Sequence, residues 1–232
     1  MKLFKIHRNF LINKISLILL IIVIFIGFLV NLFSIYSLNH EYNWFEGNNS
    51  FLEYLASNIL YYKLVIINLV CFIWGSSFTL QSNSYHLLIT GYKDLKFKFI
   101  LSKLVLLVFL TIIIILCNFY LMSFIGVVWG KFIFSFEKVL ELFLDLLLIC
   151  LIYGLLSSIF SLIFNHNYAY FMAVGLFVLG ELIKDGNSGF KLYYVFFPLI
   201  STEIENSFGM VHLLLLFIIY FILVFLGYVY KK

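Results

Sequence analysis

The sequence predicts an all-α protein that crosses a membrane several times. Hydrophobic residues make up 64% of the chain and charged residues only 11%, whereas soluble domains are about a quarter charged. Several uncharged runs are also longer than the about 20 residues that a helix needs to cross a bilayer. This composition excludes a soluble domain, and the net charge of +4 indicates contacts with lipid headgroups and no nucleic-acid partner.

The uncharged runs place six membrane helices, at about residues 15–38, 58–80, 104–130, 139–164, 168–183 and 209–230. The run from Leu146 to Gly180 is too long for one crossing, and Asn165-His166-Asn167 divides it in two. We expect residues 1–232 to form a single transmembrane domain, because no soluble segment interrupts the series.

Charge predicts the orientation of these helices. The N-terminus, residues 81–103 and the C-terminus together hold ten basic residues and one acid, while the other side holds five lysines and ten acids. Because cytoplasmic loops carry the excess of Lys and Arg, we expect both termini in the cytoplasm. This arrangement puts Lys63 near the outer end of the second helix. Residue usage typical of an AT-rich genome indicates a bacterial cell membrane.

Two flanking segments are too apolar to be free loops. Residues 1–14 alternate apolar and basic side chains, a pattern typical of an N-terminal amphipathic helix that lies in the inner interface. Residues 193–208 are aromatic and contain Pro198, the only proline of the chain. We expect this second segment, between helices five and six, to dip into the outer interface like a re-entrant segment.

The sequence offers no catalytic or metal-binding pattern. It has no HExxH, GxSxG, P-loop or dinucleotide-binding glycine motif. No two histidines have the spacing of metal ligands on one helix, and the three cysteines, at positions 71, 117 and 150, are expected to be packed core residues. We therefore expect no enzyme activity, no metal and no cofactor in this chain.

Acidic residues at the start of the fourth helix allow two interpretations. Glu137, Glu141 and Asp145 share one helical face, and Asp145 is deep enough to enter the outer leaflet. Glu141 and Asp145 could form an exit-side acidic face for cationic cargo, since ionisable groups in membranes are costly. The simpler interpretation, which we favour, is an amphipathic helix start at the headgroup level.

Small and amide side chains indicate contacts between helices. Gly154, Ser157, Ser158 and Ser161 have the spacing that permits close helix packing in lipid, within the bundle or across a dimer. Three asparagines inside apolar runs are expected to form hydrogen bonds between helices: Asn31, Asn68 and Asn118.

The basic segment between helices two and three has the signals of a short cytoplasmic helix. Ser82 or Ser84 would cap it, and Gly91 would end it. Its apolar and aromatic residues have no partner within so short a loop, so we expect them to dock on another protein: Tyr85, His86, Leu87, Leu88, Ile89, Tyr92 and Lys93. Lys98 and Lys103 are expected to anchor to lipid. The alternative is that the whole segment is only a basic anchor.

Residues Asn83–Lys103 resemble the coupling-helix region of ABC-2 type permeases, with Lys103 as the lysine that opens helix three. Phe196–Ile200 is similar to the extracellular segment of that family. The resemblance implies the membrane subunit of an ABC exporter, with ATP bound by a separate cytosolic ATPase subunit. It also implies a second permease copy or paralogue and an amphipathic peptide cargo, in bacteriocin self-immunity or toxin secretion.

Other functions remain open at this point. Drug or lipid export would suit the same resemblance. From a different class, the chain could be a substrate-capture subunit of an uptake system or a stand-alone immunity protein.

Overall fold

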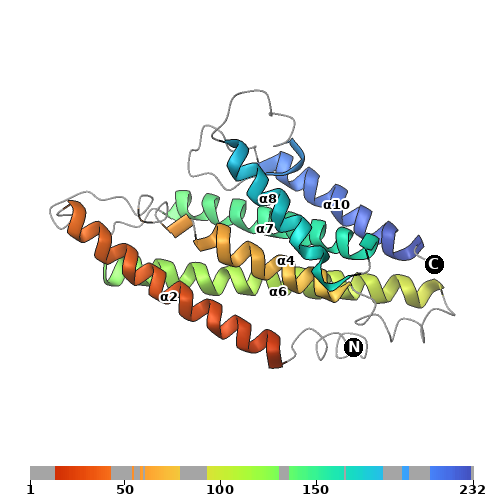
Figure 1. Ribbon diagram of the computed structural model, residues 1–232, viewed down its shortest axis with the longest axis horizontal. Coiled ribbons are helices and arrows are strands. Elements are labelled where there is room, and N and C mark those ends of the chain that lie inside the picture. Colours follow the sequence, from red (N-terminus) through yellow and green to blue (C-terminus); the bar gives the residue numbers. More distant parts are fainter. Residues whose placement is uncertain are drawn as a thin grey trace.

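The computed structural model describes residues 14–42, 54, 58–59, 61–78, 93–130, 136–164, 166–184, 195–198 and 210–230. Within these ranges every regular element is a helix, which confirms the all-α prediction. Successive helices run in alternate directions along the long axis of the molecule, so that the start of α2 and the end of α10 lie toward the same end (Figure 1).

Six helical stretches make up the described fold. The first is α2, and the second is a π-helical turn, η2, that continues directly into α4. A 3-10 turn, η3, leads from α7 into α8, and the side chain of His166 accepts a hydrogen bond from the backbone N–H of Tyr168 there (3.2 Å). The bounds are Lys14–Tyr42 for α2, Tyr62–Ile66 for η2, Ile67–Ser77 for α4, Lys93–Val128 for α6, Phe136–Phe164 for α7, Asn167–Ala169 for η3, Tyr170–Lys184 for α8 and Met210–Tyr230 for α10.

The chain is a multi-pass membrane protein. Three helical segments of the described part are long and apolar enough to cross a bilayer, namely Phe97–Val128, Leu142–Phe164 and Met210–Val229. Three shorter apolar helices accompany them: Ile21–Tyr36, Tyr62–Ser77 and Tyr170–Ile183.

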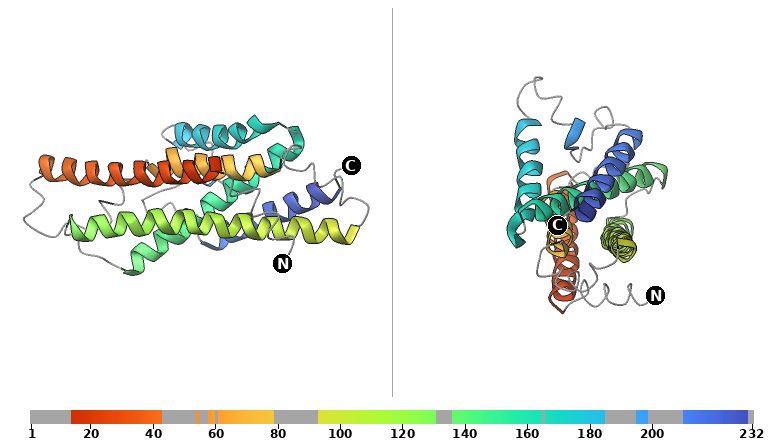
Figure 2. Two further views of the ribbon diagram at one scale, coloured as in Figure 1. Left: turned by 90° about the horizontal axis from the view of Figure 1, so that it is seen from below. Right: turned by 90° about the vertical axis from the view of Figure 1, so that its right-hand side faces the viewer.

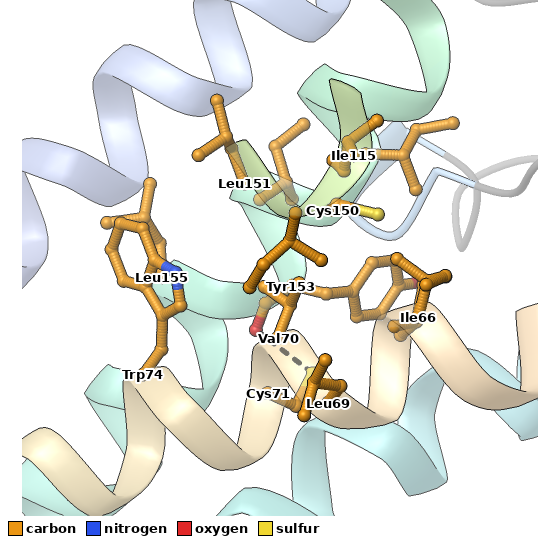
Figure 3. Close-up of a cluster of buried hydrophobic side chains, with 14 of the residues drawn as sticks. Ile66, Leu69, Val70, Cys71, Trp74, Ile115, Cys150, Leu151, Tyr153 and Leu155 are labelled. Carbon is orange, nitrogen blue, oxygen red and sulfur yellow. Dashed lines mark hydrogen bonds between the residues drawn. The ribbon is translucent and has the colours of Figure 1, made fainter. Parts of the chain in front are cut away.

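Helix α7 forms the centre of the bundle, where it packs against α4, α8, α10 and α6. Figure 3 shows one part of this core, in which Val70 and Trp74 of α4 gather with Cys150 and Leu155 of α7. The Cys71 thiol lies 3.6 Å from the carbonyl oxygen of Tyr153. The core therefore holds both sulfur and aromatic side chains.

Helix α2 lies at the edge of the bundle, alongside α6 (Figure 2). It buries a narrow strip of residues spaced four apart, namely Val23, Gly27, Asn31 and Ile35. Most of its other large side chains are exposed on the faces turned away from the bundle, as expected for contact with lipid.

Helix α6 begins earlier than the sequence predicts, at Lys93 instead of about residue 104. The lysines between these positions are therefore helical residues. Several predicted features lie outside the described residues: the N-terminal amphipathic helix, the short helix with Tyr85, His86, Leu87, Leu88, Ile89 and Tyr92, and most of residues 193–208.

Part of the last of these segments is described, and α10 holds it by two hydrogen bonds. The ring nitrogen Nε2 of His212 lies 2.8 Å from the carbonyl oxygen of Val195. The Tyr220 hydroxyl donates to the carbonyl oxygen of Phe196 at 3.0 Å. Tyr220 stands well inside α10, so these contacts keep the backbone at 195–196 against the side of that helix.

Candidate intramembrane charge site

Lys63 and Glu181 form an ion pair between two apolar helices. The Lys63 Nζ lies 2.6 Å from the Glu181 Oε2, and the two side chains are 14% and 25% exposed. Lys63 belongs to the π-helical turn η2, and Glu181 stands three residues before the end of α8. Ionisable groups inside a membrane are costly, so a paired Lys and Glu in such helices mark a candidate functional site.

The packing of α4 against α8 brings the two charges together. The ring of Phe72 meets that of Tyr170 edge to face at 5.3 Å between centroids. Gly75 permits the close approach, since a Cβ atom there would lie 2.8 Å from the Cβ of Tyr170. Because the start of α8 packs near the end of α4, the end of α8 with Glu181 reaches the start of η2–α4 with Lys63.

The ion pair lies beside the apolar length of α6 and not at its end. Tyr61, two residues before Lys63, contacts Asn118 of α6. Asn118 and Val128, the last residue of α6, are ten residues apart, and this length of α-helix spans about 15 Å. The pair thus lies beside the inner length of α6, while Lys63 itself stands near the start of its own apolar helix, Tyr62–Ser77.

The turn that carries Lys63 is π-helical, with hydrogen bonds from residue i to i+5. Such turns hold one residue more than an α-helical turn and often occur at functional sites. The Tyr62 hydroxyl, from the same turn, is buried and has no hydrogen-bond partner among the described residues. The second carboxylate oxygen of Glu181, Oε1, has none within the same part of the chain. The ion pair therefore contains one polar atom with unused hydrogen-bonding capacity, and the turn that carries Lys63 contains another.

Two tyrosines tie the chain before this turn to α2 and α6. The Tyr61 hydroxyl lies 2.6 Å from the carbonyl oxygen of Val23 and 3.0 Å from the Asn118 Oδ1. Seven residues earlier in the chain, the Tyr54 hydroxyl lies 2.8 Å from the Asn31 Oδ1 and 3.3 Å from the Met122 carbonyl oxygen.

The asparagines take part in these contacts in different ways. Asn31 and Asn118 each donate to a carbonyl oxygen of their own helix, which turns their Oδ1 atoms toward the tyrosines. Asn58 accepts a hydrogen bond from the Ser34 hydroxyl at 2.9 Å. Asn68, by contrast, donates to the carbonyl oxygen of Leu64 within its own helix.

A further buried charge is Lys103 of α6, which is only 4% exposed. Its ammonium group donates to the carbonyl oxygen of Ser77, at the end of α4, and lies 4.5 Å from the centre of the Phe78 ring. A cation at a helix C-terminus is favourable because the carbonyl groups there carry partial negative charge. The expectation that Lys103 anchors to lipid is wrong, since the side chain points into the bundle.

The small residues of α7 lie in the described core. The Ser157 hydroxyl donates to the carbonyl oxygen of Cys71 at 2.6 Å, and Ser158 donates to that of Gly154 at 3.1 Å. A Cβ atom on Gly154 would lie 2.9 Å from the Trp74 ring. Ser161 is buried, and its hydroxyl has no hydrogen-bond partner among the described residues.

The predicted acidic face is only partly described. Glu141 and Asp145 both belong to α7, and Asp145 is half-buried and takes part in an interaction. Lys93, from the predicted docking segment, is the first residue of α6. In the part of the chain that the structure describes, no three His, Cys, Asp or Glu residues gather to hold a metal ion.

Sequence reasoning missed the ion pair because its partners are 118 residues apart and share no motif. A signal was nevertheless present. Lys63 and Glu181 each fall within a stretch that is otherwise apolar, and the charge count considers Lys63 only as a residue near a helix end. Two opposite charges in two such stretches are a reason to expect pairing.

Comparison with known proteins gives one match. The family model of NADH-ubiquinone oxidoreductase (complex I), chain 5 N-terminus, matches residues 1–45, which include α2. No curated protein and no solved structure gives a match.

This match corrects the function predicted from the sequence. The matched family is not an ABC-2 permease family, so the prediction of an ABC exporter subunit is wrong, and with it the peptide-export role. The partners implied by that resemblance, including the ATPase subunit and a second permease copy, stay predictions. The described residues establish a multi-pass membrane protein with a Lys–Glu pair among its apolar helices, and the first 45 residues are similar to a chain of complex I.

Proposed function

We propose that this chain moves protons across a membrane and that the Lys63–Glu181 pair is the site that takes up and releases them. The ion pair between η2 and α8 is the observation that carries the proposal. A salt bridge between apolar helices adds little to stability, because the cost of removing two charges from water offsets their attraction. Function is the better reason for keeping such a pair.

The chemistry of the pair suits a reversible proton site. The proton on Lys63 can pass to the Glu181 carboxylate at 2.6 Å, which leaves a neutral amine beside a neutral acid. A proton from outside the pair can instead neutralise Glu181 and leave Lys63 as an unpaired cation, which is costly in apolar surroundings. Release of a proton from Lys63 then removes that cost. Transfer of the Glu181 proton to the neutral Lys63 amine then restores the ion pair. One proton has entered and one has left, so charge and atoms balance.

The position of Glu181 offers a route to the pair. It lies one helical turn from Lys184, where α8 ends, and its side chain is a quarter exposed. At the other end of α4, Lys103 places a second buried cation next to Ser77. We propose that protons enter or leave on the Glu181 side and that Lys103 lies near the opposite exit.

The wider setting of the proposal follows from charge and from the family match. We propose six membrane crossings with both termini in the cytoplasm of a bacterial cell, as the excess of basic residues near the termini supports. The matched family is described as one chain of NADH-ubiquinone oxidoreductase, which supports work inside a membrane assembly of several chains.

Proteoliposomes that contain a pH-sensitive dye test the proposal. A potassium gradient with valinomycin supplies the potential, and the dye reports proton entry. We expect Glu181→Gln and Lys63→Gln each to lower the rate by roughly tenfold or more, as for the loss of a group that transfers protons. Lys184→Gln is the matched control, because it removes a charge from the same end of α8 and leaves Lys63 and Glu181 themselves unchanged.

Two comparisons make the result decisive. The double exchange Lys63→Glu with Glu181→Lys restores an ion pair and is expected to keep the fold. Comparing its yield of folded protein with that of each single variant shows whether a single variant lost activity by unfolding. A folded Glu181→Gln protein that moves protons at the wild-type rate would remove the basis of the proposal.

A further inference from the structure

The chain on either side of η2 is held by different parts of the bundle. Before the turn, Tyr61 is fixed to α2 and α6 through Val23 and Asn118. After the turn, α4 is fixed to α7 and α6, since Ser157 donates to the Cys71 carbonyl oxygen and the Trp74 indole donates to Thr111 at 2.8 Å. The five residues of η2 join two anchored ends.

The anchor at Tyr61 depends on a glycine of α2. A Cβ atom on Gly27 would lie 2.8 Å from the Tyr61 hydroxyl oxygen and 3.2 Å from the Asn118 Oδ1. Only a residue without a side chain leaves room for the hydroxyl to reach the backbone of α2 at this point. The position of Tyr61 is thus set by α2 and α6, independently of how α4 packs on α7.

The π-helical turn takes up the mismatch between these two anchors. It holds one residue more than an α-helical turn of the same span. In the alternative arrangement, the extra residue moves into the chain that precedes Tyr61. The residues Tyr62 and Lys63 then continue the α-helix of α4. Relative to α4, that change turns each by about 100° and moves it by about 1.5 Å. Such a rotation carries the Lys63 side chain away from Glu181.

The present arrangement leaves polar groups that another arrangement can satisfy. The Tyr62 hydroxyl is buried without a hydrogen-bond partner among the described residues, and so is one oxygen of Glu181. Leu64, in the middle of the turn, is 55% exposed and fills no space in the core. The turn thus carries one buried polar group without a partner among the described residues, and its ion-pair partner carries another, which favours an arrangement that would satisfy them.

We propose that η2 switches between two registers, a π-helical one in which Lys63 meets Glu181 and an α-helical one in which it does not. Tyr61 is the positioning residue that holds the paired register through Val23 and Asn118. The proposed proton transfer would then be gated by this turn, and only that consequence rests on the proposed function. The two registers themselves are a property of the fold.

Crosslinking measures the register directly, without transport. In a Cys117→Ser background, Cys71 and Cys150 are buried, and cysteines placed at positions 63 and 181 are bridged by a short bifunctional thiol reagent. Tyr61→Phe removes the anchoring hydroxyl, so we expect the ratio of crosslinked to uncrosslinked protein to fall about fivefold. Tyr120→Phe is the matched control, because Tyr120 is an exposed tyrosine of α6.

Deletion of Leu64 supplies an arm with the opposite sign. The deletion removes the extra residue while both anchors remain, so the turn becomes α-helical with Lys63 still facing Glu181. We therefore expect the crosslinked fraction to rise. It should also no longer fall when Tyr61→Phe is added. Equal crosslinking in the full-length, Tyr61→Phe and Leu64-deleted proteins would overturn the proposal. If crosslinking responds as expected while wild-type liposomes move no protons, the switch stands and the proposed function fails.

Discussion

The interface between α4 and α7 and the interface between α2 and α6 are built in different ways. At the first, which we term the close-packed interface, a Cβ atom on Gly75 would lie 2.5 Å from the Ser157 hydroxyl oxygen. At the second, the hydrogen-bonded interface, Tyr54 and Tyr61 link the two helices through their hydroxyl groups. The first interface depends mainly on missing side chains, and the second mainly on tyrosine hydroxyl groups, one of which fits beside Gly27.

The difference reflects how helices associate in a membrane. Lipid tails are as apolar as leucine, so burial of apolar side chains gives little drive for helices to meet. Close backbone approach and hydrogen bonds between helices supply what remains. The core of this protein relies mainly on the first means and its edge mainly on the second. Substitutions at the two interfaces should therefore lower the stability of the fold by different amounts.

The largest effect is expected from a bulky residue at the close-packed interface. Gly75→Val introduces atoms that overlap Ser157 and Tyr170, and overpacking of this kind costs about 3 kcal/mol. We expect little folded protein after extraction, measured by size-exclusion chromatography in a mild detergent. Gly175→Val is the control, because nothing lies within 4 Å of a Cβ atom there. Equal yields of the two variants would show that the α4–α7 approach is not tight.

At the hydrogen-bonded interface, Tyr61→Phe should cost about 1 kcal/mol, which corresponds to a melting temperature lower by about 2 to 4 °C. Unfolding is followed with a thiol-reactive dye in a Cys117→Ser background, in which the buried Cys71 and Cys150 become reactive. Tyr120→Phe should leave the melting temperature unchanged. A shift as large as that of Gly75→Val would erase the distinction between the two interfaces.

A smaller loss is expected from Ser157→Ala. The hydroxyl donates to a backbone carbonyl oxygen across the close-packed interface at 2.6 Å, and such hydrogen bonds in membranes contribute about 0.6 kcal/mol on average. The same dye assay measures it. If this variant were less stable than Tyr61→Phe, hydrogen bonding would be at least as important at the core as at the edge.

The only effect of opposite sign is expected from Ser161→Ala. Its hydroxyl is buried with no hydrogen-bond partner among the described residues, so its removal relieves a desolvation cost. We expect no change or a gain of up to about 1 kcal/mol. A clear loss of stability would indicate a partner beyond the described part of the chain.

The fold class could be predicted from the sequence because it depends on local composition. Long uncharged runs require helices in lipid, and the all-α, multi-pass prediction is confirmed on that ground. The π-helical turn gave no signal, since the residues Tyr62–Ile66 read as an ordinary helix and the irregularity arises from anchors on other helices.

The charge site was missed for a related reason. Charge counting treats every lysine near a helix end as a headgroup contact, so it assigned Lys63 and Lys103 to the interfaces. Their true partners, Glu181 and the Ser77 carbonyl oxygen, are set by how helices far apart in sequence pack. A second error came from loose motif likeness, which suggested an ABC-2 permease and was overturned by the match of residues 1–45.

The tyrosine contacts of α2 also determine the order in which this helix can gain its partners during synthesis. Asn31 is followed by its partner Tyr54 after 23 residues, whereas Tyr61 precedes its partner Asn118 by 57 residues. Ribosomes add about 5 to 20 residues per second, so Tyr61 waits roughly 3 to 11 s for that amide. Throughout this interval α2 has only part of its attachment. We therefore expect a newly made α2 to lack its contacts with α6 until residues beyond 118 have been synthesised.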